Sequence, residues 1–138
     1  MHVLDEAPLK PEVRALAKKI FRIVGEAESR VHACPLEEVH FHETGAVDSI
    51  VDIVARRPAP WIWELRNLRF HDYEARATVW CQHGRIPVPA PAVAGIAAAE
   101  ELDLAITNVS GEMVTPTGAA IAAAFRTKKR PAQDFRDP

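Results

Sequence analysis

The sequence predicts a single domain of the α+β class, with three or four helices packed on a small β-sheet. Residues 11–33 repeat apolar side chains at the spacing of an amphipathic helix. Two alanine-rich segments each begin at a proline, and short segments of strand type lie between the helical ones. A length of 138 residues fits one core rather than two. We expect residues 1–126 to form the domain and residues 127–138 to be a polar, disordered tail.

The composition argues against several classes of protein function. The chain is 48% hydrophobic and 26% charged, with a formal net charge of −2, which is typical of a soluble globular protein. A nucleic-acid binder would normally carry a basic face, so that class is not favoured. No apolar run reaches the roughly 20 residues that span a bilayer, and no secretory signal opens the chain. Cys34 and Cys81 are far apart, so we expect two reduced thiols in a cytoplasmic protein.

The first long element is the helix over residues 11–33. Pro11 suits the first helical position, and Glu12 places negative charge near the positive end of the helix dipole. The helix has to end before Pro35, because proline restricts the residue that precedes it. The apolar face that we expect to be buried is made of Val13, Leu16, Ala17, Ile20, Val24, Ala27 and Val31.

The next segments are predicted with less regular structure. Residues 35–39 suit a short helical turn, and residues 40–45 suit an extended segment or loop that ends at a glycine. Residues 48–54 begin with a good helix cap, Asp48, although their β-branched run also fits a buried strand. We interpret the three tryptophans, Trp61, Trp63 and Trp80, as core residues.

The second half alternates strands and helices. Residues 75–80 and 104–109 read as strands, and residues 91–101 and 116–126 as helices. Prolines at 87, 89 and 91 favour an extended, polyproline-like entry into the helix at 91. Thr115 is the expected N-cap of the last helix, with Pro116 at its first position. The order of the strands in the sheet cannot be derived from this pattern.

The segment His40-Phe41-His42-Glu43 is the first candidate for chemistry. In an extended chain, residues two apart point to the same side, so His40 and His42 can present two imidazoles to one ion. Glu43 can add an oxygen, and this donor set suits Zn, Ni, Fe or Cu. The competing interpretation is an exposed strand whose outward residues happen to be histidines. Further along, Asp48 and Asp52 would lie one turn apart on a helix and could line the same site.

A second candidate spans residues 111–118. A helix N-terminus with free amides, the hydroxyls of Thr115 and Thr117 and the small Gly118 makes a natural anion site, with Glu112 close by in the sequence. It is not a P-loop, because the Gly-Lys-Ser/Thr ending is absent. Ordinary helix capping by Thr115 explains the same residues more simply.

A third candidate pairs Cys81 with His83. A cysteine and a histidine two residues apart could act as soft metal ligands or as an activated thiolate. Nucleophilic catalysis would need a third, orienting group that the sequence does not identify. A turn at Gly84 with a partly buried Cys81 is the simpler interpretation.

Three segments, taken in order, resemble one known family. They are Glu38–Val54, His83–Pro91 and Gly111–Ala120. Together they resemble the nickel insertion proteins of nickel-pincer nucleotide biosynthesis, the LarC family, and the helix at 11–33 resembles the helix that precedes the histidine segment in that family. Residues 55–80 do not resemble it. His40, His42 and Glu43 fall on one matching segment, and Thr115, Thr117 and Gly118 fall on another.

The resemblance implies a function. Members of the family insert nickel into pyridinium bisthiocarboxylic acid mononucleotide and form carbon–nickel and sulfur–nickel bonds, which yields the cofactor of lactate racemase. The reaction is that of a lyase, consumes CTP and needs Mn or Mg. We therefore expect nickel at His40, His42 and Glu43, and the phosphate of the mononucleotide at Thr115, Thr117 and Gly118. Asp48, Asp52, His83 and Glu112 are further candidate site residues.

The chain is shorter than full-length members of the family, and the domain that carries their CTP site is absent from it. We therefore expect this chain to be the metal-handling and substrate-holding domain, to form a homo-oligomer, and to need a separate partner that binds CTP. The alternative is a non-catalytic structural or assembly module that keeps the fold. A third hypothesis, a hydrolase built on Cys81 and His83, has the weakest support.

Overall fold

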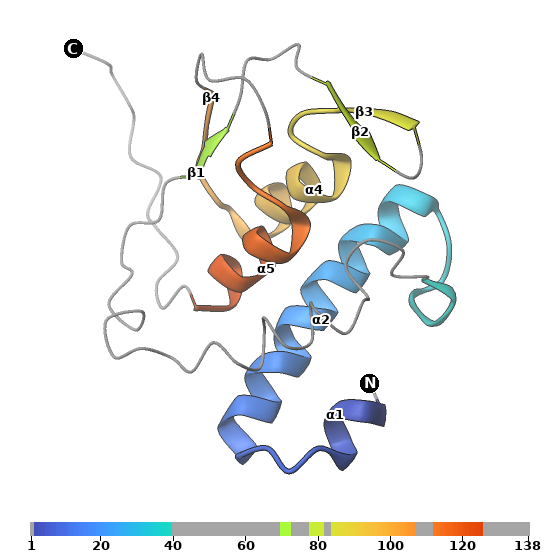
Figure 1. The fold of residues 1–138 in the computed structure, drawn as a ribbon, viewed down its shortest axis with the longest axis vertical. Helices are drawn as coiled ribbons and strands as arrows, with labels where there is room; N and C mark the ends of the chain where they lie inside the picture. The colour runs from blue at the N-terminus through green and yellow to red at the C-terminus, as the bar shows by residue number, and fades with distance from the viewer. Residues whose placement is uncertain (1, 40–69, 73–77, 82–83, 107–111, 126–138) are drawn as a thin grey trace, which may run out of the picture.

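The computed structural model describes residues 2–39, 70–72, 78–81, 84–106 and 112–125. Within these ranges it contains four α-helices, a short 3₁₀ helix and four short strands (Figure 1). This content confirms the α+β class and the helix number expected from the sequence. The elements are α1 (His2–Glu6), α2 (Pro11–His32), η1 (Leu36–Glu38), β1 (Phe70–Asp72), β2 (Thr78–Cys81), β3 (Gly84–Pro87), α4 (Pro91–Glu100), β4 (Leu104–Ile106) and α5 (Pro116–Phe125).

Helix α2 is the longest element, and its ends lie where the sequence places them. Pro11 is its first residue and Glu12 lies in its first turn. The helix ends at Ala33, which adopts the left-handed conformation and donates its backbone N–H to the carbonyl of Ser29. The Ser29 hydroxyl in turn donates to the carbonyl of Cys34 at 2.6 Å. The predicted helix over 11–33 is therefore confirmed to within one residue.

The core forms where α2 packs against α4 and α5, which also contact each other (Figure 1). The fully buried side chains are small or β-branched, so the three helix backbones can approach closely. Burial of this apolar surface is the main source of stability. The cluster contains Leu4, Ala17, Ile20, Ile23, Val24, Ala27, Ala90, Ala92, Val93, Ile96, Val114, Ala119, Ala120, Ala123 and Ala124.

One residue of the expected apolar face is not buried. Val31 is 43% exposed, whereas Val24, two turns earlier on the same face, is 2% exposed. The reason is length: α2 has 22 residues, while α4 and α5 have 10 each. At about 1.5 Å per residue, α2 extends well past both of its partners. The amphipathic pattern therefore continues into a turn that neither α4 nor α5 covers.

The short helix α1 was not predicted, because its pattern is only five residues long. Its Leu4 is 3% exposed and belongs to the core cluster. Two polar contacts from α2 hold this segment: Lys18 forms an ion pair with Asp5, and Arg14 Nη2 donates to the Ala7 carbonyl at 3.0 Å. These contacts turn the N-terminal segment back along the first half of α2.

The strands form two separate pairs among the described residues. β1 pairs with β4 in parallel, with Phe70 opposite Leu104, and β2 pairs with β3 as an antiparallel hairpin. β2 confirms the described end of the strand predicted over 75–80, and β4 confirms the first half of the one predicted over 104–109. β1 lies in the segment that sequence reasoning left unassigned, so its pairing with β4 could not be anticipated.

The proline segment leads from the hairpin into α4. Pro87 ends β3, the Val88–Pro89 peptide bond is cis, and Pro91 is the first residue of α4. The extended entry predicted here is thus a strand followed by a bend, not a continuous polyproline segment. Helix α4 stops at Glu101, which has a φ of 55°. The prediction of a helix over 91–101 and of another over 116–126 is confirmed in both cases to within one residue.

Several predictions lie outside the described residues. They are the extended segment at 40–45, the helix or strand from Asp48, the core positions of Trp61 and Trp63, and the tail at 127–138. Within the part of the chain that is described, no helix has the length and hydropathy needed to cross a membrane.

The two valines of α2 offer a matched test of where the core ends. Val24→Ala should lower the free energy of unfolding by about 2 kcal/mol, because it opens a cavity beneath α4 and α5. Val31→Ala makes the same chemical change at an exposed position and should change it by less than about 0.5 kcal/mol. Urea denaturation followed by circular dichroism measures both values. Equal losses would mean that Val31 is packed as tightly as Val24.

Candidate functional site

The N-terminus of α5 is the one sequence-predicted site whose residues the structure describes. Thr115 precedes the helix and Pro116 opens it. The Gly118 backbone N–H donates to Thr115 Oγ1 at 3.2 Å, and the Ala119 N–H donates to the Thr115 carbonyl at 2.9 Å. Thr115 is therefore the N-cap that the sequence predicts. Proline at the first position has no N–H, so it leaves no donor unsatisfied there.

This cap determines which donors remain for a ligand. Of the first four residues of α5, Pro116 has no amide hydrogen and two other amides are already bound by Thr115. The Thr117 amide and the hydroxyls of Thr115 and Thr117 are left to meet an anion. Thr115 is exposed, and Thr117 and Gly118 are half-buried, so all three can be approached from solvent.

Gly118 leaves room for the side chain of Thr115. A Cβ atom built at this position would lie 3.3 Å from Thr115 Oγ1, which is closer than nearly all real contacts of a Cβ atom. A larger residue would therefore push the Thr115 side chain aside and disturb the cap. The glycine therefore leaves room for the Thr115 hydroxyl at the end of the helix.

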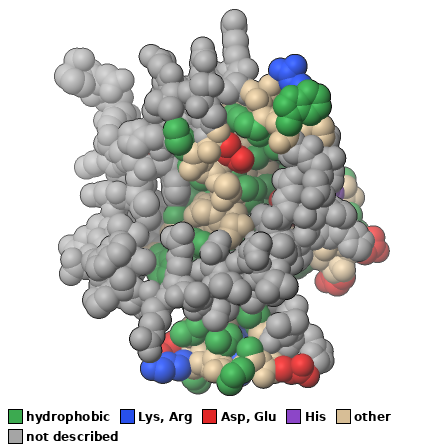
Figure 2. Space-filling view, viewed as in Figure 1, with side chains coloured by type: hydrophobic (Ala, Val, Ile, Leu, Met, Phe, Trp, Pro, Cys, Tyr) green, Lys and Arg blue, Asp and Glu red, His purple; other side chains and the backbone are tan. Residues whose placement is uncertain are grey.

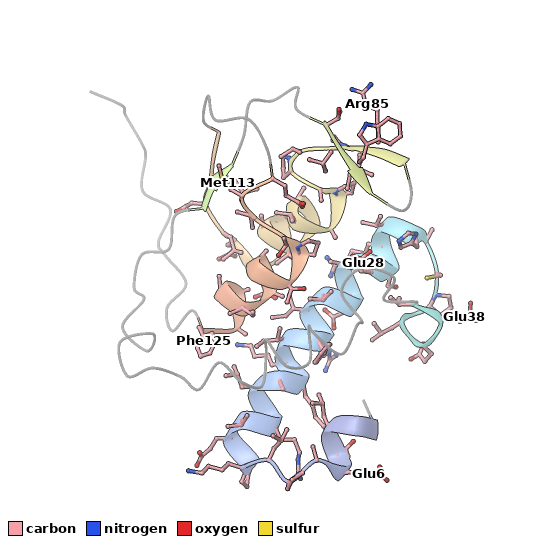
Figure 3. All side chains as sticks on the ribbon, viewed as in Figure 1. Glu6, Glu28, Glu38, Arg85, Met113 and Phe125 are labelled. Carbon is pink, nitrogen blue, oxygen red and sulfur yellow. The ribbon has the colours of Figure 1, made fainter. Side chains whose placement is uncertain are left out.

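The packing of α5 fixes the direction in which its N-terminus points. Val114, just before the cap, is 6% exposed and belongs to the core cluster, whereas Glu112 and Met113 are exposed. At the other end, Lys19 Nζ donates to the carbonyl of Ala124 at 3.1 Å. Figure 3 marks these two ends with the labels of Met113 and Phe125. The helix is thus anchored by the core along its length and by α2 at its C-terminus.

The expected metal ligands lie outside the described residues. They are His40, His42 and Glu43, together with the further candidates Asp48, Asp52 and His83. Across the ranges that are described, no three His, Cys, Asp or Glu side chains come together as a metal site would require. His32 and Glu28, one turn apart near the end of α2, do lie side by side, with Nε2 and Oε2 3.4 Å apart. They supply two ligand-type groups, which is fewer than the three of a metal site in the described part of the chain.

The structure corrects the interpretation of Trp80 as a core residue. Trp80 is 80% exposed. Strand alternation explains the difference: Val79 and Ile86 face inward, and Ile86 packs against the core cluster, so Trp80 has to face outward. The signal was present in the sequence, because neighbouring residues of one strand cannot both point to the core. Arg85, opposite Trp80 in β3, was also missed as a candidate.

Comparison of the sequence with known protein families assigns the chain to one class of protein. The model of the family described as "Nickel insertion protein" matches residues 1–136, so the chain belongs to that family. This confirms the resemblance drawn from the three sequence segments and corrects the exclusion of residues 55–80, because the match runs through them as well.

Curated relatives give the class a more particular description. The chain is 50% identical over 127 residues to the pyridinium-3,5-bisthiocarboxylic acid mononucleotide nickel insertion protein of Alkaliphilus metalliredigens, covering 91% of this chain and 30% of the relative. It is 37% identical over 130 residues to the protein of the same description from Acetivibrio thermocellus, covering 94% of this chain and 32% of the relative. A putative nickel insertion protein of Geobacter sp. is 47% identical over 132 residues, with 89% and 32% covered.

This chain therefore spans about a third of the length of these relatives. No solved structure gave a significant match.

The Thr115 cap can be tested by two substitutions. Thr115→Ala removes the oxygen that binds the Gly118 amide and should lower the free energy of unfolding by about 1 kcal/mol. Thr115→Ser keeps the oxygen and should cost only a few tenths of that amount. Thermal and urea denaturation measure the difference. If alanine and serine variants are equally stable, the hydroxyl does not cap α5.

Proposed function

We propose that this chain is the metal-handling and substrate-holding part of a nickel insertion enzyme that acts on pyridinium bisthiocarboxylic acid mononucleotide. The observation that carries the proposal is the family match over residues 1–136, together with relatives whose names state this substrate and this metal. In this role nickel is a substrate that the protein delivers to the mononucleotide.

His40, His42 and Glu43 are the residues that we propose to hold nickel before its transfer. Two imidazoles and a carboxylate form a donor set of the kind that nickel accepts. An ion held by only a few protein ligands keeps open positions for the sulfur and carbon atoms of the incoming substrate. Asp48, Asp52, His83 and Glu112 are further residues that we assign to this site or to its surroundings.

Thr115, Thr117 and Gly118 are the residues that we propose to hold the phosphate of the mononucleotide. The Thr117 amide and the two hydroxyls supply neutral donors, and the helix dipole of α5 adds a partial positive charge. Because the Thr115 hydroxyl already binds the Gly118 amide and Pro116 has no amide hydrogen, this site offers fewer donors than an uncapped helix end without proline. Phosphate affinity here should therefore be modest, and the rest of the substrate has to contribute to binding.

The remaining chemistry belongs to a partner. We propose that CTP, with Mn or Mg, binds a separate domain or protein that works with this chain as a cytoplasmic, homo-oligomeric assembly. The relatives are about three times as long as the part that matches this chain, which leaves room in them for a domain of this kind. On its own the chain should bind nickel and the mononucleotide without completing the insertion.

Nickel titration by calorimetry tests the proposed ligands. The His40→Ala/His42→Ala double variant should bind Ni²⁺ at least about tenfold more weakly than the unaltered chain, because both imidazoles are lost. His32→Ala is the matched control: it removes one histidine from the end of α2, where Glu28 lies beside it and the described residues form no metal site, and should leave the main binding event unchanged.

Equal nickel affinity in the double variant and the unaltered chain would exclude His40 and His42 as ligands. Loss of binding in His32→Ala alone would move the site to the end of α2. If the unaltered chain binds neither nickel nor a mononucleotide, the chain is a structural module of the family and not the metal-handling part of the enzyme.

A further inference from the structure

The outer face of the β2–β3 hairpin presents an aromatic ring beside a cation. Because side chains alternate along a strand, Thr78 and Trp80 share one face of β2. The register places Arg85 directly opposite Trp80, and Pro87 opposite Thr78, so all four residues lie on this face. All four are exposed, and we call them the hairpin platform. Figure 2 shows hydrophobic and basic surface meeting at the end of the molecule where Figure 1 draws this hairpin.

Trp80 does not serve the fold. Its exposed fraction is 80%, the largest among the exposed hydrophobic residues of the described ranges. The hairpin is attached to the core through its other face, where Ile86 packs. An indole that buries so little surface contributes little to the core, and its flat, polarisable ring is free to stack on another ring.

Arg85 is held in place beside that ring. Its Nε and Nη2 atoms both donate to Thr78 Oγ1, at 3.1 Å and 2.7 Å, which fixes the guanidinium along the strand. Figure 3 shows Arg85 pointing away from the helices. No acidic side chain of the described residues forms a salt bridge with it. The guanidinium has five N–H donors, so several remain for an external anion, and little conformational entropy is left to lose on binding.

We propose that the hairpin platform binds a planar aromatic ring that carries acidic groups, with Trp80 stacked on the ring and Arg85 paired to one of these acid groups. A pyridinium ring with acid groups at positions 3 and 5 has both properties, so this proposal rests on the proposed function and assigns a ring-binding role to that function. A cationic ring is attracted to the face of an indole, and a carboxylate matches the guanidinium fork.

The charge and size of the platform favour a small anion over a macromolecule. It presents one ring and one cation, whereas nucleic-acid surfaces need several cations, and the chain as a whole has a net charge of −2. Protein interfaces of stable complexes need about 800 Å² on each partner, far more than four side chains of a two-stranded hairpin provide.

The test uses 1-methylpyridinium-3,5-dicarboxylate, which has the ring and its acid groups but neither ribose nor phosphate. Its affinity for the 138-residue chain is measured by calorimetry, and the indole N–H signals are followed by NMR. Trp80→Ala and Arg85→Ala should each weaken binding by about tenfold. Trp80→Phe should retain more affinity than Trp80→Ala, and Arg85→Lys should retain less than the native arginine, because lysine keeps the charge without the fork.

Two controls separate this site from the rest of the molecule. Leu36→Ala alters another exposed apolar residue, on η1, and should leave the affinity for the ring unchanged. The affinity for ribose 5-phosphate should fall in the Thr117→Val variant and stay unchanged in Trp80→Ala, because this compound has a phosphate but no aromatic ring. Failure of the phosphate or nickel measurements with intact ring binding would count against the proposed function alone, and the reverse result would count against the platform alone.

Unchanged affinity for the ring in both Trp80→Ala and Arg85→Ala would overturn the proposal, provided that their circular dichroism spectra match that of the unaltered chain. It would also be overturned if light scattering shows that Trp80→Ala dissociates a dimer, because the platform would then be a contact between two copies of the chain.

Discussion

The packing of α2 against α4 and α5 is the constraint on which the rest of the molecule depends. Three helices can approach one another closely only where the side chains between them are small, and α5 supplies five buried alanines. A larger residue at Ala120 or Val93, which are 0% exposed, would separate the helices and move the loops at their ends. The cap at Thr115, the entry into α4 and the seat of the hairpin are all positioned by this contact.

The two candidate sites of the described residues are built in different ways. The N-terminus of α5 uses backbone amides whose direction is set by the core, and the cap occupies part of its binding capacity. The hairpin platform uses side chains on the solvent face of a strand pair, whose opposite face packs against the core through Ile86. The first suits the recognition of a phosphate, and the second suits the recognition of a flat ring. A nucleotide-like substrate carries both groups.

Local sequence signals were sufficient to predict where most of the helices begin and end. Pro11 and Pro91 mark the first residues of α2 and α4, and Pro35 requires α2 to end before it, so sequence and structure agree to one residue. The Thr115 cap followed from the same reasoning. The prediction that Trp80 is buried was wrong because it rested on residue type and ignored strand alternation. The prediction that Val31 is buried was wrong because helical periodicity does not reveal where a partner helix ends. The pairing of β1 with β4 depends on contacts between distant segments, which one sequence does not record.

That parallel pairing has a consequence for the order of folding. β1 and β4 can meet only after the chain between Asp72 and Leu104 has returned to the same side, and that chain contains both the hairpin and α4. The hairpin and each single helix rest on local contacts, which form quickly, whereas the parallel pair and the packing of α2 on α4 and α5 both have to close long loops first. The strand pair therefore belongs with the helical core among the long-range contacts of the fold, and it ties the segment before the hairpin to the segment after α4.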